Sequence, residues 1–370
     1  MLEQVHLGKT DVLVPPLGIG TWAWGDRLVW NYGSGYGEKD IREAFDVSLN
    51  AGIDFFDTAE IYGNGQSERF LGTFIRASGK PVTLATKFMP YPWRLSRKEL
   101  IHSLHNSLER LGVDRVDLYQ IHMPMPPVPI ETWMDVLADA VEQGLARAVG
   151  VSNYNAVQVR RAYEALAKRN IPLATNQIEY SLLHRQPERN GVLATCREYD
   201  VSVIAYSPIA KGLLTGKYTP DHRPRGLRGW RMGGINLARI QPLVQRMREI
   251  GAESGGKTPS QVALNWLICK NTIPIPGAKN ARQAEEDVGG LVVLPHPSTG
   301  SGSAQDKGTG NSGPALGRSP EQSAGPAKVW SPSTAGGSSR PPAQIKDSWR
   351  LTPAQVAELD MLSEQVTMKL

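Results

Sequence analysis

The sequence predicts a single α/β barrel in which eight parallel strands alternate with eight helices. Three observations support this fold. Short apolar runs alternate with amphipathic helical patterns along most of the chain, and this alternation is typical of a parallel sheet covered by helices. The unit occurs eight times, the number of strands that closes a (β/α)8 or TIM barrel. The chain of 370 residues is long enough for such a barrel. A doubly wound open sheet is the competing architecture.

The expected elements follow one another in strict alternation. Strands are expected near residues 17–22, 53–57, 82–87, 115–121, 146–151, 173–177, 201–206 and 272–275. Helices are expected near residues 39–51, 67–78, 97–111, 131–143, 155–169, 188–199, 237–254 and 279–289. Ser96 and Glu99 match a capping box before the third helix, and Gly112 follows its end. Residues 5–14, interrupted by Gly8-Lys-Thr-Asp11, indicate an N-terminal β-hairpin.

The repeating pattern ends after the eighth helix. Residues 1–290 are expected to form the barrel, and residues 291–346 are dominated by Ser, Gly, Pro, Ala, Thr and Gln. Such a segment buries too little apolar surface to fold, so we expect a disordered insertion whose deletion spares catalysis. Residues 347–370 are expected to supply a C-terminal helix that packs on the barrel, with Thr352 as N-cap and Pro353 at the first helical position.

Composition and charge narrow the class of protein. No stretch approaches the length of a membrane span, and the N-terminus lacks the features of a signal peptide, so we expect a cytoplasmic protein. Cys196 and Cys269 lie in apolar segments and are expected to be reduced thiols, with no metal site. The net charge of +5 arises partly from a basic loop that carries Lys211, Lys217, Arg223, Arg225, Arg228 and Arg231. Because no nucleic-acid-binding motif accompanies it, this loop fits a phosphorylated cofactor better than nucleic acid.

Four polar residues mark a candidate catalytic site. Asp57, Lys87 and His122 each close an apolar strand-like run, and Tyr62 lies in a Gly-bearing loop five residues after Asp57. Since parallel strands all point the same way, their carboxyl ends meet at one face of a barrel. We therefore expect these four side chains to converge there.

Their chemistry suits the reduction of a carbonyl group. Hydride addition to the carbonyl carbon leaves negative charge on the oxygen, so a proton must be supplied, and a tyrosine hydroxyl can supply it. Lys87 is expected to lower the pKa of Tyr62, while Asp57 holds Lys87 charged and oriented. His122 is expected to bind the substrate oxygen.

Several motifs resemble the aldo-keto reductase superfamily. They are Asp57-Thr-Ala-Glu-Ile-Tyr62-Gly, Thr86-Lys87, Leu118-Tyr-Gln-Ile-His122 and Gly150-Val-Ser-Asn-Tyr154. Within the superfamily the chain is most similar to the bacterial and plant branch, which includes pyridoxal reductase-like and channel β-subunit-like proteins. The resemblance implies Tyr62 as the general acid, with Asp57, Lys87 and His122 completing a tetrad. The family commonly has Trp after this histidine, whereas this chain has Met123, so we expect an altered pocket wall.

The resemblance also implies a nicotinamide cofactor. Ser152, Asn153 and Gln177 match residues that bind the carboxamide of the cofactor, and Tyr206 matches the aromatic residue on which its ring stacks. Further residues match the segment that follows the pyrophosphate, namely Ser207, Gly212 and Leu214.

A strand leading into a helix near residue 280 suits the phosphate of the cofactor. A helix N-terminus offers N–H donors and positive potential to an anion, and Lys279 and Arg282 add charge that favours NADP(H) over NAD(H). Glu286 and Asp287 resemble the adenine-contacting pair of the family, where Asn is usual at the second position. Asp287 is therefore expected to add a negative charge beside the adenosine. Gly277 and Gln283 complete this patch.

One fingerprint is misleading. Gly18-Ile-Gly20-Thr-Trp-Ala23 fits the G-x-G-x-x-A pattern of dinucleotide-binding folds, which requires a helix to begin inside it. No helical pattern follows, so Gly20, Thr21 and Trp22 are expected to line the barrel mouth near the cofactor. Candidates for an apolar substrate pocket are Trp24, Trp30 and Tyr91.

The sequence therefore predicts NADPH-dependent reduction of a small-molecule aldehyde or ketone. A cofactor-bound redox sensor or regulatory subunit with very slow turnover is the alternative, because slow cofactor release would leave the same residues in place. A nucleic-acid-binding role for the basic loop is a third, weaker hypothesis. The identity of the carbonyl substrate and the oligomeric state have no signature in the chain.

Overall fold

Eight parallel strands form a closed barrel in the computed structural model, which describes residues 2–223, 236–291 and 349–367. Each strand pairs with the next one along the chain. The strands are β3 (Ile19–Gly20), β4 (Phe55–Asp57), β5 (Thr83–Phe88), β6 (Val116–Ile121), β7 (Ala146–Ser152), β8 (Leu173–Glu179), β9 (Ser202–Tyr206) and β10 (Ile273–Ile275). The barrel closes where Gly20 pairs with Gly277 and the Gly18 N–H donates to the Pro274 carbonyl over 3.0 Å. This confirms the predicted (β/α)8 barrel and excludes an open sheet.

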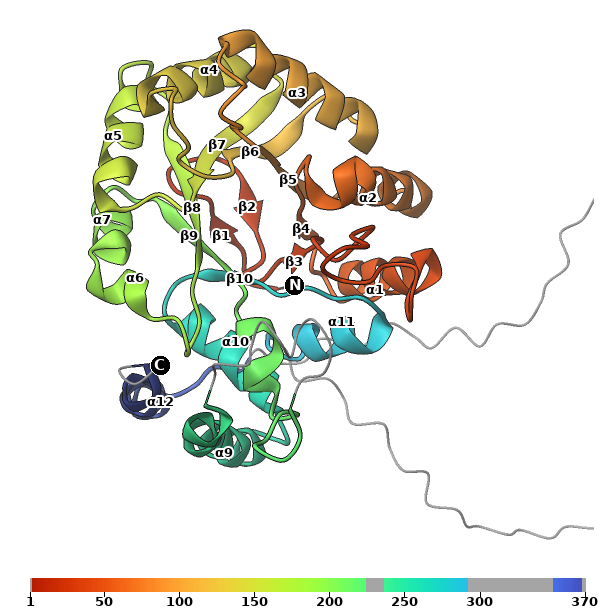
Figure 1. The fold of residues 1–370 in the computed structure, drawn as a ribbon, viewed down its shortest axis with the longest axis vertical. Coiled ribbons are helices and arrows are strands. Elements are labelled where there is room, and N and C mark those ends of the chain that lie inside the picture. The colour runs from red at the N-terminus through yellow and green to blue at the C-terminus, as the bar shows by residue number, and fades with distance from the viewer. Residues whose placement is uncertain (1, 224–235, 292–348, 368–370) are drawn as a thin grey trace, which may run out of the picture. The chain divides into compact units, whose positions relative to one another are not determined.

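Helices form a ring outside these strands (Figure 1). They are α1 (Glu38–Asn50), α2 (Gln66–Ser78), α3 (Arg97–Leu111), α4 (Ile130–Glu142), α5 (Ala156–Ala167), α6 (Gln186–Arg189), α7 (Val192–Glu198), α9 (Leu237–Glu253), α10 (Pro259–Cys269) and α11 (Ala281–Val288). Two short 3₁₀ helices, η1 (Tyr62–Gly65) and η2 (Ala210–Thr215), lie in the loops after β4 and β9. The main apolar core fills the layer between strands and helices.

The N-terminal hairpin fills one end of the barrel. Its strands β1 (Val5–His6) and β2 (Leu13–Val14) pair antiparallel, as the sequence predicts. Hairpin residues Leu7 and Val12 pack in a second core with inward-facing strand residues such as Phe55 and Ile204. Gly8 has φ +57°, and a Cβ there would lie 2.8 Å from the Ala174 carbonyl oxygen. The hairpin therefore approaches the barrel closely enough to require glycine.

Three features of the expected secondary structure are wrong. Helix α10 has no counterpart in the sequence prediction. The helix expected over residues 188–199 is two short helices, α6 and α7, because Gly191 adopts φ +83° between them. Ser96 is the N-cap of α3 but makes no side-chain capping bond. One carboxylate oxygen of Glu99 is buried without a hydrogen-bond partner among the described residues, and Glu99 lines a polar cavity of about 430 Å³.

The C-terminal segment packs on the barrel helices. Helix α12 (Pro353–Thr367) lies against α9, and its Asp360 accepts hydrogen bonds from Trp266 Nε1 and Lys270 Nζ. The segment expected to be a disordered insertion lies outside the described residues from 292 onward. Among the helices described, none combines the length and apolarity needed to cross a membrane.

Candidate active site

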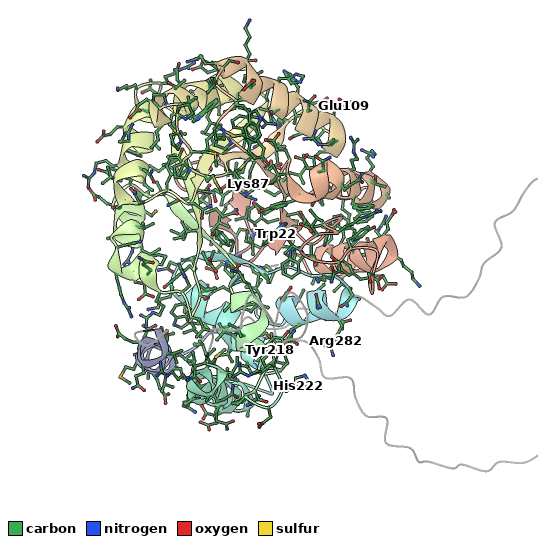
Figure 2. The ribbon with its side chains drawn as sticks, viewed as in Figure 1. Trp22, Lys87, Glu109, Tyr218, His222 and Arg282 are labelled. Carbon is green, nitrogen blue, oxygen red and sulfur yellow. The ribbon has the colours of Figure 1, made fainter. Side chains whose placement is uncertain are left out.

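The carboxyl ends of three neighbouring barrel strands bring the predicted tetrad together. Asp57 is the last residue of β4, Lys87 lies in β5 and His122 directly follows β6, while Tyr62 opens η1. Figure 2 shows Lys87 within the ring of helices and Arg282 on α11. Tyr62 and His122 face each other edge to face, with ring centroids 5.7 Å apart and an interplanar angle of 85°. The convergence expected from the strand ends is present.

A buried ion pair anchors the tetrad. The Lys87 ammonium donates to Oδ1 of Asp57 and, over 2.8 Å, to the Thr58 carbonyl oxygen. Both charged side chains are almost fully buried. Burial raises the pKa of Asp57 and lowers the pKa of Lys87, whereas their mutual attraction opposes both shifts. The pair therefore holds the ammonium in one orientation, with its Nζ 3.5 Å from the Tyr62 hydroxyl oxygen.

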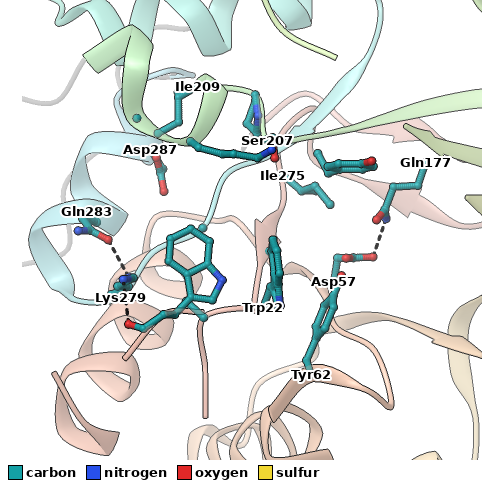
Figure 3. A pocket seen from close by; sticks show the side chains of 18 of the residues that line it. Trp22, Asp57, Tyr62, Gln177, Ser207, Ile209, Ile275, Lys279, Gln283 and Asp287 are labelled. Atoms are coloured by element: carbon teal, nitrogen blue, oxygen red, sulfur yellow. Dashed lines mark hydrogen bonds between the residues drawn. The ribbon is translucent and has the colours of Figure 1, made fainter. Parts of the chain in front are cut away.

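Two glutamine side chains complete the surroundings of Asp57. Gln177 Nε2 donates to Oδ2 of Asp57 over 2.8 Å, and Gln120 Nε2 donates to the same oxygen over 3.4 Å. Figure 3 shows the Gln177–Asp57 bond beside Tyr62. These bonds favour the ionised carboxylate. Gln120 was not predicted as a site residue, although its position two residues before His122 places it on the same face of β6.

The Tyr62 hydroxyl is a neutral donor in this site. Burial, with a smaller contribution from Asp57, raises the pKa of Tyr62 well above its usual value. This corrects the expectation that Lys87 makes the resting phenol more acidic, because desolvation of the phenolate is the larger effect. Tyr62 therefore keeps its proton until negative charge appears on a neighbouring atom.

His122 is uncharged in the same surroundings. Burial, and then the Lys87 ammonium, lower the pKa of His122 to about 3. Its Nδ1 is buried without a hydrogen-bond partner among the described residues. A neutral imidazole protonated on Nε2 can donate a hydrogen bond into the site without adding charge.

One cavity of about 650 Å³ joins the tetrad to the predicted cofactor residues. Of the predicted catalytic and cofactor-binding residues, all line this cavity except Thr21, Lys87 and Leu214. Lys87 lies behind Tyr62, as described above. Thr21 is fully buried, and its hydroxyl donates to the Asp57 carbonyl oxygen over 3.0 Å. Leu214 is buried in the main apolar core. Neither Thr21 nor Leu214 therefore presents its side chain to a ligand in this cavity.

Polar residues at the ends of β7 and β9 form a linked group. Tyr206 OH donates to Asn153 Oδ1 over 2.9 Å, and Asn153 Nδ2 donates to Ser152 Oγ over 3.0 Å and to the His122 carbonyl oxygen over 3.1 Å. Asn153 has φ +63°, the left-handed conformation that asparagine tolerates better than most residues. Asn153 thus links the Tyr206 side chain to the backbone of His122.

The N-terminus of α11 faces the other end of the cavity. Asn280 caps this helix by accepting from the Gln283 N–H. Arg282 is exposed, lines the cavity, and makes no hydrogen bond or ion pair with any residue that the structure describes. Lys279 instead lies 4.5 Å from the centroid of the Trp30 ring. The two predicted phosphate-binding cations therefore have different surroundings.

The Asp287 carboxyl group does not have the negative charge that the sequence predicts. It is buried, and its Oδ2 has no hydrogen-bond partner among the described residues. Burial, with a smaller contribution from Glu286, raises the pKa of Asp287 well above its usual value. The neutral carboxylic acid is favoured, which corrects the expectation of an added negative charge beside the adenosine.

The candidate substrate-pocket aromatics divide into two groups. Trp30 lines the cavity with Trp22, and their rings meet edge to face at 5.5 Å. Trp24 is fully buried, donates from Nε1 to the Ala278 carbonyl oxygen over 2.8 Å and packs against Phe56. Tyr91 lines the separate polar cavity next to α3. The assignments of Trp24 and Tyr91 to the substrate pocket are therefore wrong.

Several further residues line the main cavity without having been predicted as site residues. They include Ile61, Ile209, Lys211, Lys217 and Ser260. Met123, which was expected to alter the pocket wall, also lines this cavity. The positive charge of Lys211 and Lys217 was the available signal, and the basic loop was interpreted as lying beside a phosphorylated cofactor. The other basic residues expected in that loop, from Arg225 to Arg231, lie outside the described residues. Ser260 was missed together with α10, on which it lies.

Comparison with known proteins identifies many relatives. Residues 16–297 match the model of the Aldo/keto reductase family. The chain is 41% identical over 303 residues to chloroplastic pyridoxal reductase of Arabidopsis thaliana, which covers 78% of this chain and 81% of that protein. It is 34% identical over 264 residues to aldo-keto reductase yakc of Schizosaccharomyces pombe, whose name specifies NADP(+), covering 66% and 76% of the two chains.

A solved structure shows the same architecture. The crystal structure of a thermostable aldo-keto reductase in complex with the inhibitor epalrestat matches with a TM-score of 0.62 and 30% sequence identity. The match covers 78% of this chain and 93% of that one.

Proposed function

The chain belongs to the aldo/keto reductase family of oxidoreductases, and on this basis we propose that it reduces an aldehyde or ketone with NADPH as hydride donor and Tyr62 as proton donor. One observation carries the proposal. The Tyr62 hydroxyl, with the Lys87 ammonium 3.5 Å behind it, shares a wall of the 650 Å³ cavity with the His122 ring. A carbonyl oxygen placed between Tyr62 and His122 would meet two neutral hydrogen-bond donors.

The chain's own residues have defined tasks in this reaction. NADPH, when bound, supplies the hydride that reduces the carbonyl carbon. His122 donates a hydrogen bond to the carbonyl oxygen and helps to orient it. As negative charge develops there, Tyr62 transfers its hydroxyl proton to that oxygen. The Lys87 ammonium stabilises the phenolate that remains, and Asp57 keeps Lys87 in position.

The rest of the cavity suits NADPH. The amide and hydroxyl groups of Asn153 and Ser152 lie at the tetrad end, where a carboxamide needs polar partners. At the other end, the N-terminus of α11 offers backbone donors and positive potential to a phosphate. Arg282 adds a guanidinium there that makes no hydrogen bond or ion pair with the described part of the chain, which suits the 2′-phosphate that distinguishes NADPH from NADH.

Steady-state consumption of NADPH tests the proposal. The purified protein is supplied with aromatic and aliphatic aldehydes, and with pyridoxal because the Arabidopsis relative is named for it. We expect repeated turnover, which Tyr62→Phe should lower by about 10²- to 10⁴-fold. Binding of NADPH, followed by its fluorescence, should be nearly unchanged in that variant. Retained turnover in Tyr62→Phe would remove Tyr62 as the acid.

The same experiment separates the two hypotheses about turnover. Continued NADPH consumption supports a reductase. A single turnover followed by no further reaction would instead support the cofactor-bound sensor or regulatory subunit, in which cofactor release is very slow.

A further inference from the structure

The side chain of Lys279 lies in an aromatic cage. Its ammonium is 4.5 Å from the centroid of Trp30 and 4.7 Å from the centroid of Tyr36, and it donates to the Trp30 carbonyl oxygen over 3.5 Å. Its backbone N–H is held separately by Gln283 Oε1 over 3.0 Å. Lys279 therefore ties the start of α11 to the loop between β3 and α1, residues 21–37.

This loop is itself well organised around the cage. The Asp26 carboxylate accepts from the Val29 N–H over 2.7 Å and from the Trp30 N–H over 3.4 Å. The Tyr36 hydroxyl donates to the Ala23 carbonyl oxygen over 2.6 Å. The loop thus holds Trp30 and Tyr36 in fixed places, and Lys279, two residues before α11, contacts both rings.

The cage continues to the proton donor. Trp30 meets Trp22 edge to face, and Trp22 stacks on Tyr62 with centroids 6.1 Å apart and an interplanar angle of 30°. Figure 3 shows Trp22 between Lys279 and Tyr62. All four of these side chains line the main cavity. A shift of the Trp30 ring would therefore displace Trp22, which forms the cavity wall next to Tyr62.

We propose that Lys279 is a positioning residue that fixes the Trp30–Trp22 wall of the substrate cavity. This rests on the proposed function, in which a carbonyl substrate lies between that wall and a nicotinamide cofactor. The role differs from phosphate binding in one measurable respect. A residue that only binds the 2′-phosphate affects reactions with NADPH alone, whereas a residue that fixes the wall affects substrate KM with either NADPH or NADH.

Lys279→Met tests this distinction, because methionine keeps an unbranched apolar stem and removes the cation. With saturating NADH, the KM of an aromatic aldehyde such as nitrobenzaldehyde should rise about 3- to 10-fold, the range expected for loss of cation–π contacts. The same rise is expected with saturating NADPH. Lys279→Arg should restore most of the wild-type KM, since it keeps a cation over the rings. An unchanged KM with NADH in Lys279→Met would overturn the proposal.

A second readout needs no turnover. In cofactor-free protein, acrylamide should quench tryptophan fluorescence more strongly in Lys279→Met than in wild type, and this difference should disappear when Trp30 is replaced by Phe in both. Lys39→Met is the matched control, because Lys39 on α1 is 90% exposed and lies outside the cavity lining. If no carbonyl is reduced by wild type, the proposed function fails, while the quenching result still decides whether Lys279 orders the wall. Equal quenching in Lys279→Met and wild type would contradict the proposal that Lys279 fixes the position of Trp30.

Discussion

Gln177 Nε2 donates to Oδ2 of Asp57 over 2.8 Å, so a residue expected to contact the cofactor also holds the buried carboxylate of the tetrad. Gln177 lies in β8 and lines the cavity, and Asp57 ends β4 on another side of the barrel. The other oxygen of Asp57 accepts from Lys87. One carboxylate therefore links Gln177 in the cavity wall to Lys87, whose ammonium lies 3.5 Å from the Tyr62 hydroxyl oxygen.

Breaking this buried pair on one side should destabilise the protein strongly. Asp57→Asn leaves the Lys87 ammonium buried without its counter-ion, which typically costs about 3–5 kcal/mol in the free energy of unfolding. The double variant Asp57→Asn/Lys87→Met removes that charge and should recover part of the stability but none of the activity. Urea unfolding of the three proteins measures this. A double variant no more stable than Asp57→Asn would show that the unpaired Lys87 charge is not what destabilises the single variant.

Arg282 should distinguish the two nicotinamide cofactors. Arg282→Ala removes a guanidinium that has no partner among the described residues and lines the cavity at the start of α11. Loss of a charge-assisted contact with the 2′-phosphate should weaken NADPH binding about 10- to 100-fold. NADH binding should weaken far less. Fluorescence titration with both cofactors measures the two dissociation constants, and equal losses would refute recognition of the phosphate by Arg282.

Asp287 should make the stability of the protein depend on pH. Its folded-state pKa is raised above its unfolded value, so its stabilising contribution is complete below about pH 4 and is lost as the pH rises toward the folded-state pKa. Asp287→Asn removes this titration. The Tm of the variant relative to wild type should therefore rise as the pH is raised above about 4, the unfolded-state pKa of an aspartate.

Thermal unfolding across this pH range measures the effect of Asp287. Asp114→Asn, at an exposed aspartate, is the matched control and should show no such trend. A difference between Asp287→Asn and wild type that stays constant with pH would show that Asp287 is ionised in the folded protein.

Removal of residues 292–348 should leave catalysis intact. The described segments on either side are held together by Asn265, whose Nδ2 donates to the Gly290 carbonyl oxygen over 3.0 Å and to the Trp349 carbonyl oxygen over 2.8 Å. A short Gly/Ser linker from Leu291 to Trp349 can therefore close the gap. We expect kcat and KM within about twofold of the full chain, and a large loss of rate would show that the removed residues act on the site.

The order of the elements and the tetrad could be predicted because their signals are local. The alternation of apolar runs and amphipathic segments identified the strands and most helices, and the rule that parallel strands end at one face placed Asp57, Lys87 and His122 together. Helix α10 had no such signal. Its residues from Ser260 to Ile268 are all buried, so it lacks the polar face that makes a helix recognisable in a sequence.

The sequence by itself determined the barrel, the strand-end residues and the charge of the basic patches, since each depends on the order and type of neighbouring residues. Only the tertiary structure decided which tryptophans face the cavity and which carboxyl and phenol groups are neutral. It also decided that Lys279 lies against Trp30, a residue 249 positions away in the chain. Burial and long-range contacts set these properties, because desolvation and ring packing depend on segments that are far apart in the sequence and adjacent only in the folded barrel.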